Sequence, residues 1–256
     1  TPERRHERYE YSAQLQMCFG LLTGHFYLSK AKNFHETLKL SDHFGLQSES
    51  HLLAERANMH DSSVQKQLKL LDRQAKQAYQ SQVLDISING YRVRWSNDEA
   101  PQNLRTGEFI LMSENFQNKW KGGVIRWIKQ SVDKSYEIGL EVIAQEMYPC
   151  AVKVHADRSS FNYHPCLLIQ IQHLESTSST LILPNLAFFK EQQAIYLRLG
   201  EQELKVYLTK TVLMTQSFIQ FDFELLNDEQ QIMIHQFIDL QSTEANNHQD
   251  VWEALK

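Results

Sequence analysis

Two groups of polar residues in this sequence have types and spacings that suit the binding of a ligand. The first is at the amino-terminal end, where Arg4, Arg5 and Arg8 lie within five residues. A guanidinium is planar and presents paired donors to a phosphate or to the O6/N7 edge of guanine. Three guanidiniums so close together predict an anion clamp.

The second group runs from Asp85 to Gly90. Because successive side chains of a strand alternate between its faces, we expect Asp85, Ser87 and Asn89 on one side of a strand. Gly90 follows, where the missing side chain lets a backbone approach a ligand closely. A carboxylate accepts from the N1–H and N2–H2 donors of a purine, and a hydroxyl donates to a phosphate or a base. Together the two groups suit a ligand with guanine at its ends and phosphate in its middle.

The composition excludes several classes of protein. The chain has 256 residues, of which 42% are hydrophobic, and a net charge of -5. This apolar content is enough for a folded core, and the length predicts two units or one large all-β unit. No apolar run approaches the ~20 residues that span a bilayer. The acidic balance predicts no nucleic-acid partner, so any anion site must be a local cluster of cations.

Catalytic and metal-binding signatures are not found in the sequence. It has no nucleophile elbow, Gly-rich phosphate loop, His-Glu-x-x-His pair or Rossmann fingerprint, so we expect no enzyme and no metal site. The histidines between residues 25 and 60 are too far apart to share adjacent helical turns, and we expect them at the surface or in helix packing. Three scattered cysteines favour reduced thiols and a cytoplasmic location. A start at Thr1 without Met favours a fragment of a longer protein.

The pattern of apolar residues changes along the chain. Alternation over residues 13–19 predicts a strand that ends at Gly20. Residues 20–82 have a helical texture, with an amphipathic helix expected over Ser62–Gln82. Its narrow apolar stripe must dock on the rest of the fold or on another copy, so a homo-oligomer is one expectation.

Short alternating segments from Val83 onward predict antiparallel strands, including one over Val83–Trp95. The pattern restarts after Pro149 and ends in a helix over Asp228–Leu240, with a loose tail beyond it. The tryptophans are expected to fill or rim a core. The predicted fold is mainly β, with a helical insertion and two small antiparallel β-barrels in tandem. Its segments are an arm and first strand (1–19), the insertion (20–82), the two barrels (83–147 and 148–241) and the tail (242–256).

The two polar groups resemble a known pair of motifs. Arg4-x-x-x-Arg8 and Asp85-x-Ser87-x-x-Gly90, with the strand pattern over 83–143, are similar to the signature of PilZ domains, bacterial receptors for cyclic di-GMP. The resemblance implies a non-catalytic receptor that needs no cofactor. It also implies that Arg4 and Arg8 hold the phosphates and guanine edges, while Asp85, Ser87 and Gly90 hold the other guanine. Arg5 and Asn89 are expected to add contacts.

One departure from the family pattern matters for this interpretation. Some sixty residues of helical texture separate the arginines from the second motif. A strand over residues 13–19 that pairs with the barrel would bring the motifs together at small loop-closure cost. The second barrel has neither motif and is expected to be a degenerate PilZ-like partner. The alternative function is a protein-interaction or assembly module that keeps the barrel and binds no nucleotide.

Overall fold

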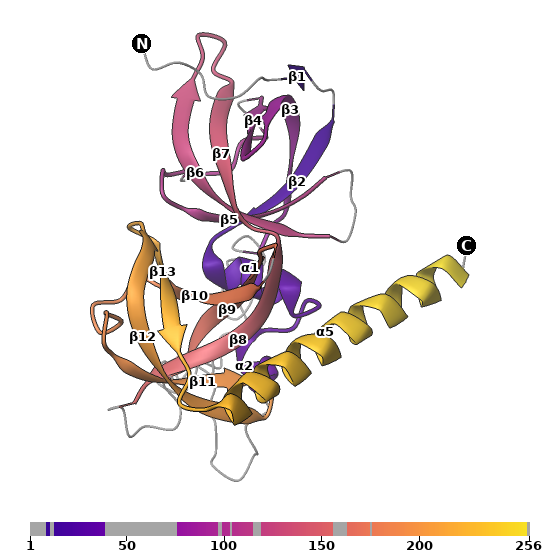
Figure 1. Ribbon diagram of the computed structural model, residues 1–256. Coiled ribbons are helices and arrows are strands. Elements are labelled where there is room, and N and C mark those ends of the chain that lie inside the picture. The colour runs from indigo at the N-terminus through magenta and orange to yellow at the C-terminus, as the bar shows by residue number, and fades with distance from the viewer. Residues whose placement is uncertain are drawn as a thin grey trace, which may run out of the picture.

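The computed structural model consists mainly of two antiparallel β-barrels in tandem (Figure 1). It describes residues 9–10, 13–38, 76–96, 99–102, 104–114, 119–155, 163–174 and 176–254. The mainly β fold class predicted from the alternating segments is confirmed.

The first barrel closes in the order β3-β2-β5-β6-β7-β4, with β4 pairing back onto β3. A short strand, β1, lies beside β3 outside this ring. Alternate residues point inward to an apolar core that includes Leu15, Val93, Trp95 and Ile138. The strands are β1 (Tyr9–Glu10), β2 (Gln14–Phe19), β3 (Tyr79–Ser87), β4 (Gly90–Trp95), β5 (Phe109–Glu114), β6 (Lys121–Gln130) and β7 (Tyr136–Ala144).

The second barrel closes in the order β10-β13-β12-β11-β8-β9. Its core continues into the carboxy-terminal helix α5 (Asp228–Ala254), which contributes Ile234, Phe237 and Ile238. The strands are β8 (Glu146–Val154), β9 (His164–Gln172), β10 (Thr177–Pro184), β11 (Ala194–Leu199), β12 (Gln202–Met214) and β13 (Phe218–Glu224).

A buried apolar cluster joins the two barrels. It combines outward-facing residues of the first barrel, such as Phe109 and Val124, with Leu167, Ile169 and Phe218 of the second. The rings of Phe109 and Phe218 meet edge to face, with their centroids 5.7 Å apart. Helix α1 (Leu21–Leu28) lies between the barrels (Figure 1). The short helix α2 (Phe34–Thr37) follows it.

Three details of the predicted secondary structure are wrong. The tail predicted beyond Leu240 is helical, because α5 continues to Ala254 through a stretch without Gly or Pro, where adding residues to an existing helix is easy. Tyr79–Gln82, predicted as helix, begins β3 because pairing with β2 outweighs a weak helical propensity. Val83–Trp95, predicted as one strand, is a hairpin that turns at Ile88 and Asn89.

Most of the predicted insertion, residues 39–75, lies outside the described residues. Its two described ends are tied to each other, because the Tyr27 hydroxyl donates to the Lys76 carbonyl and Lys76 Nζ donates to Asn33 Oδ1. In the described part of the chain, no helix is both long and apolar enough to cross a bilayer.

Candidate functional site

The register of β1 and β2 decides where the amino-terminal arm approaches the barrel. Tyr9 is opposite Ile86 and Glu10 is opposite Asp85, while β2 continues along the same edge of β3. Arg4, Arg5 and Arg8 lie outside the described residues. Arg8 is nevertheless the residue directly before Tyr9, and paired strands are only about 4.8 Å apart. The strand pairing that the two-motif interpretation requires is therefore present.

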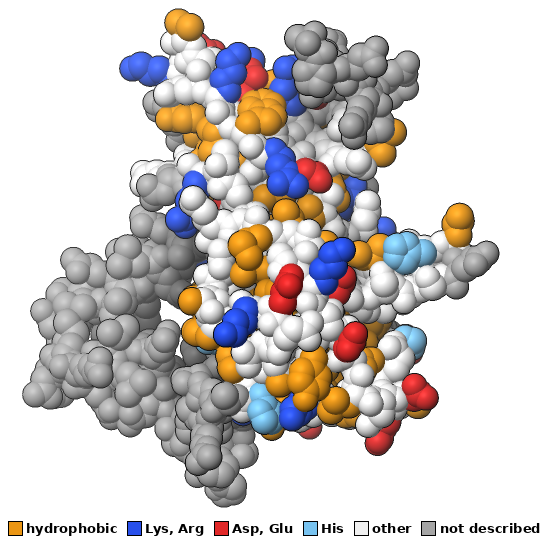
Figure 2. Space-filling view, turned by 60° about the vertical axis from the view of Figure 1, so that its left-hand side comes forward, with side chains coloured by type: hydrophobic (Ala, Val, Ile, Leu, Met, Phe, Trp, Pro, Cys, Tyr) orange, Lys and Arg blue, Asp and Glu red, His pale blue; other side chains and the backbone are white. Residues whose placement is uncertain are grey.

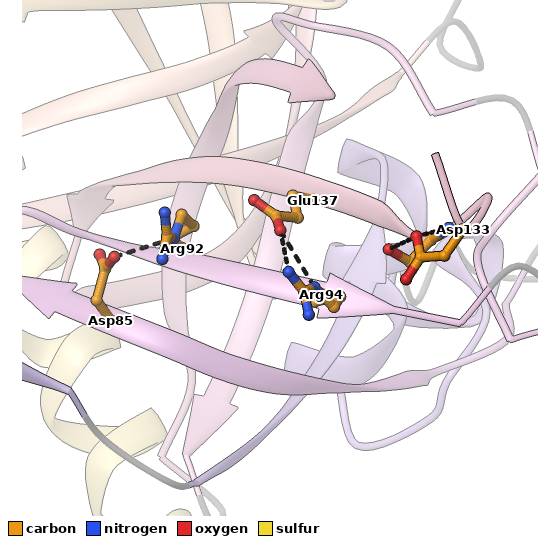
Figure 3. A network of polar contacts seen from close by, with 6 residues as sticks. Asp85, Arg92, Arg94, Asp133 and Glu137 are labelled. Carbon is orange, nitrogen blue, oxygen red and sulfur yellow. Dashed lines mark hydrogen bonds and ion pairs between the residues drawn. The ribbon is translucent and has the colours of Figure 1, made fainter. Parts of the chain in front are cut away.

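Asp85 lies in the hairpin β3–β4 opposite Arg92. Its Oδ2 is 2.9 Å from Arg92 Nε, and the residue is only 8% exposed (Figure 3). The Nε is buried but is not aligned for a hydrogen bond. Arg92 was not among the residues predicted for the site, because the sequence alone does not show which residue faces Asp85.

A row of residues crosses four strands on the outer face of the barrel. The register places Asp85 opposite Arg92, Arg92 opposite Gly139, and Gly139 opposite Trp127. A Cβ atom at Gly139 would lie 2.0 Å from Trp127 Nε1, so the indole rests against the glycine backbone. The Trp127 side chain is 37% exposed. We call these four residues the cross-strand row.

Both ends of the cross-strand row follow a β-bulge. Register shifts lie between Val83 and Asp85 and between Ile125 and Trp127. Val83 and Ile125 face the core, and strict alternation would point the residues two positions later inward as well. An extra residue in each strand turns Asp85 and Trp127 to the outer face instead. Trp127 therefore lies on the outer face, which the sequence prediction missed.

The remaining residues of the second motif form the hairpin turn. Ser87 Oγ donates to the Gly90 carbonyl at 3.3 Å, and exposed Asn89 accepts from the backbone N–H of Val142 at 2.9 Å through its own carbonyl. Asn89 lies in the turn, so the prediction that it continues the strand is wrong. At Gly90 a Cβ atom would lie 1.9 Å from the Leu140 carbonyl oxygen. The close approach of β7 thus requires glycine here.

Comparison with known families identifies the first barrel. Residues 1–71 and 46–149 match the family described as the middle PilZ domain of the cyclic-di-GMP receptor FimW. The chain belongs to this family. Residues 150–226 match a second family, the FimW C-terminal beta-barrel domain, so the second unit also has a counterpart there. The description of the PilZ family is that of a receptor and not of an enzyme.

Individual proteins are similar as well. The cyclic-di-GMP receptor FimW of Pseudomonas aeruginosa is 24% identical over 254 residues, which cover 86% of this chain and 41% of the relative. The chain thus spans about two fifths of that protein.

Two solved structures are more distant. K. pneumonia MrkH in complex with c-di-GMP has a TM-score of 0.28 and 13% identity, covering 66% of this chain and 85% of that one. Borreliella burgdorferi PlzA in complex with c-di-GMP has a TM-score of 0.21 and 11% identity, covering 65% and 85%.

A groove of about 610 Å³ lies on the PilZ barrel, and its lining includes Gln14, Gln82 and Arg94 but none of the four residues of the cross-strand row. Arg94 lies opposite Glu137 and forms an ion pair with it (Figure 3). The hydrogen bond from Arg94 lowers the pKa of Glu137, so this carboxylate stays ionised. On the face shown in Figure 2, cations lie beside carboxylates and form no broad basic surface.

Among the described residues of the PilZ domain and its partner barrel, no group of His, Cys, Asp and Glu side chains is arranged to hold a metal ion. His25 is buried, and its Nε2 is 2.9 Å from the Cys150 carbonyl oxygen. Burial lowers the pKa of His25 to about 4, and the bond to Cys150 opposes the shift. This histidine packs the junction between α1 and the second barrel, as expected for a helix-packing residue.

Proposed function

We propose that this chain is a cyclic di-GMP receptor that binds the nucleotide on the outer face of its first barrel. The observation that carries the proposal is the register of Glu10 with Asp85, which supports an approach of the arginine arm to the second motif. Membership of the PilZ family adds to it. The proposed contact residues are Arg4, Arg5, Arg8, Asp85, Ser87, Asn89 and Gly90.

Asp85 and Arg92 act together in this proposal. The Arg92 guanidinium lies against Asp85 Oδ2, with its Nε 2.9 Å from that oxygen, and holds the carboxylate in place. An ionised carboxylate is the acceptor that the N1–H and N2–H2 donors of guanine require. Arg92 is thereby a positioning residue for Asp85. The arginines of the arm neutralise the two phosphates, since guanidinium and phosphate form paired, charge-assisted hydrogen bonds.

Trp127 supplies a stacking surface at the other end of the cross-strand row. Its indole is partly exposed and lies on the same outer face as Asp85. Aromatic side chains bind bases by stacking, and each stacked base contributes about 1–3 kcal/mol. We therefore add Trp127 to the proposed contacts.

Calorimetric titration with cyclic di-GMP tests the proposal. The wild-type chain is expected to bind, while Arg8→Ala and Asp85→Ala each weaken binding by about tenfold or more, because each removes a charged hydrogen-bonding group. Arg105→Ala is the matched control, since Arg105 is 70% exposed and pairs with Glu108 away from the row. No heat at submillimolar ligand, or equal loss in the control, contradicts the proposal.

The receptor is proposed to signal by changing its arrangement with a protein partner or a second copy in the cytoplasm. Helix α5 extends beyond the second barrel and offers one surface for such contacts (Figure 1). The alternative is an assembly module that ignores the nucleotide. Light scattering separates the two functions, because an oligomer of unchanged mass with and without cyclic di-GMP favours the module.

The division of the chain into the five predicted segments also stays a prediction.

A further inference from the structure

A small pocket lies where the segment after α1, the second barrel and α5 meet. Its volume is about 160 Å³, and its lining includes Lys30, Lys32, Thr37, Arg198 and Gln241. Among the described residues that line it, three are cations and none is Asp or Glu. This is unusual in a chain whose net charge is -5, and it marks a local positive potential. We call this space the junction pocket.

Arg198 is held in a fixed position at the junction pocket. Its Nε donates to the Leu38 carbonyl at 3.0 Å, and its guanidinium carbon lies 5.7 Å from the centroid of the Tyr163 ring. Within the described part of the chain, this is the one hydrogen bond of its side chain. No described residue accepts a hydrogen bond from its two terminal amines. A guanidinium anchored in this way loses little side-chain entropy when it binds an anion.

Burial lowers the pKa of Arg198, and nearby Glu201 opposes the shift. Arginine nonetheless remains protonated in proteins. A partly buried guanidinium gains more from a bound anion than an exposed one, because water screens the interaction less. Arg198 is thus the strongest candidate anchor in the pocket.

The backbone shape keeps the pocket in place and open. Lys30 and Ala31 have φ values of 56° and 58°, which turn the chain after α1 so that it returns over the second barrel. Phe34 and Leu38 then pack on Ala151 and Tyr163. On the opposite side Gly200 forms the β11–β12 turn, and a Cβ atom there would meet nothing within 4 Å. The segment after α1 and the β11–β12 turn thus both contribute to the lining of the pocket.

We propose that the junction pocket binds a small phosphate-type anion, either inorganic phosphate or the phosphoryl group of a small monoester. The fork of Arg198 matches the geometry of phosphate oxygens, and Lys32 adds charge for a dianion. The volume suits one such group, and is below the roughly 300–1,000 Å³ of pockets for drug-sized ligands, so a dinucleotide is excluded. Binding would tie the segment after α1 and the base of α5 to the second barrel. The proposal is independent of the cyclic di-GMP site.

The test is titration of the whole chain with inorganic phosphate at constant ionic strength, followed by calorimetry and by thermal unfolding. Phosphate is expected to raise the unfolding temperature of the wild-type chain above that seen with chloride. Arg198→Gln is expected to weaken binding by about tenfold or more, and Arg198→Lys to weaken it less, since lysine keeps the charge without the fork. A second titration with glycerol phosphate distinguishes the sources. Tighter binding than phosphate assigns a phosphorylated metabolite, and weaker or equal binding assigns inorganic phosphate.

Two further variants keep the test decisive if Arg198→Gln fails to fold. Lys32 is exposed, so Lys32→Gln is expected to preserve the fold while weakening phosphate binding. Arg105→Gln removes a highly exposed cation elsewhere and is expected to bind phosphate like the wild type. A phosphate effect equal to that of chloride overturns the proposal. So does unchanged phosphate binding in folded Arg198→Gln or Lys32→Gln.

Discussion

The two barrels share one type of closed sheet but close their cores in different ways. In the second barrel, α5 packs Ile234, Phe237 and Ile238 onto the core. In the first, inward-facing Tyr91 donates to Glu114, and Lys121 Nζ lies 3.0 Å from the Tyr91 hydroxyl and 2.9 Å from Glu114. Their hydrogen bonds lower the pKa of Glu114 and keep it ionised. The core of the first barrel thus borders a polar triad, whereas the core of the second borders a helix.

The outer faces differ too. In the second barrel, Lys153 is 9% exposed, with its Nζ 4.8 Å and 5.3 Å from the ring centroids of Tyr163 and Tyr196 and 3.6 Å from Glu203 Oε2. Its cation is satisfied within the barrel itself. The first barrel instead has a carboxylate and a partly exposed indole on one outer face. Both outer-face charges thus have partners within their own barrel, and the barrels differ in that the first also places a partly exposed indole in the same row as its ion pair. One closed sheet can therefore carry different polar and aromatic groups on its outer face, because those side chains do not take part in closing the core.

The largest expected effect is a difference in stability between Gly→Ala substitutions in the two barrels. Gly90→Ala places a Cβ atom 1.9 Å from the Leu140 carbonyl oxygen, so β4 and β7 must separate. We expect a loss of about 3 kcal/mol or more in the free energy of unfolding, together with loss of cyclic di-GMP binding. Gly200→Ala has open space but a φ of 63°, and is expected to cost about 1 kcal/mol. Urea unfolding measures both, and equal losses would contradict the prediction.

The helix that closes the second core is expected to contribute more to stability than the polar triad of the first. Phe237→Ala removes a buried ring from the second core and is expected to cost about 3 kcal/mol of unfolding free energy. Tyr91→Phe removes one hydroxyl while Glu114 and Lys121 still pair, so about 1 kcal/mol is expected. Chemical unfolding curves give both values. A greater loss for Tyr91→Phe would mean that the polar triad is the stronger closure.

The junction between the barrels is expected to weaken in acid. The pKa of His25 falls from 6.5 to about 4 because the ring is buried, so the folded protein resists its protonation. The contribution of neutral His25 to the free energy of unfolding is fully present above pH 6.5 and is lost as the pH falls towards 4. At pH 5 the expected loss is about 2 kcal/mol relative to pH 7. The difference in urea midpoints between wild type and His25→Gln isolates this contribution, and parallel pH profiles would contradict it.

The last prediction concerns ligand binding at the cross-strand row. Trp127→Ala removes the proposed stacking surface and should weaken cyclic di-GMP binding by about 1.5 kcal/mol, roughly tenfold. Trp127→Phe keeps an aromatic face and should restore part of the affinity. Tyr207→Ala, at a partly exposed aromatic of the second barrel, is the matched control. Calorimetry measures all three, and equal affinity of Trp127→Ala and wild type would remove Trp127 from the site.

Local patterns in the sequence predicted most of the architecture. Alternating apolar residues located most strands, and the restart after Pro149 indicated a second barrel, because a half-buried strand needs period-2 patterning. The ends of the elements were less predictable. The local composition of Tyr79–Gln82 predicts a helix, but pairing with β2 makes it a strand. The hydrogen bonds that stabilise a strand come from residues distant in sequence, so local composition does not show them.

The sequence by itself determined the mainly β fold and the two motifs, because residue type and spacing are local properties. The tertiary structure decided which residues meet. Arg92 and Trp127 join Asp85 only through strand register, and two bulges turn Asp85 and Trp127 from the core side to the outer face. Arg198 likewise reaches Leu38 across 160 residues of sequence. Register and long-range packing depend on the whole sheet, so no local pattern specifies them.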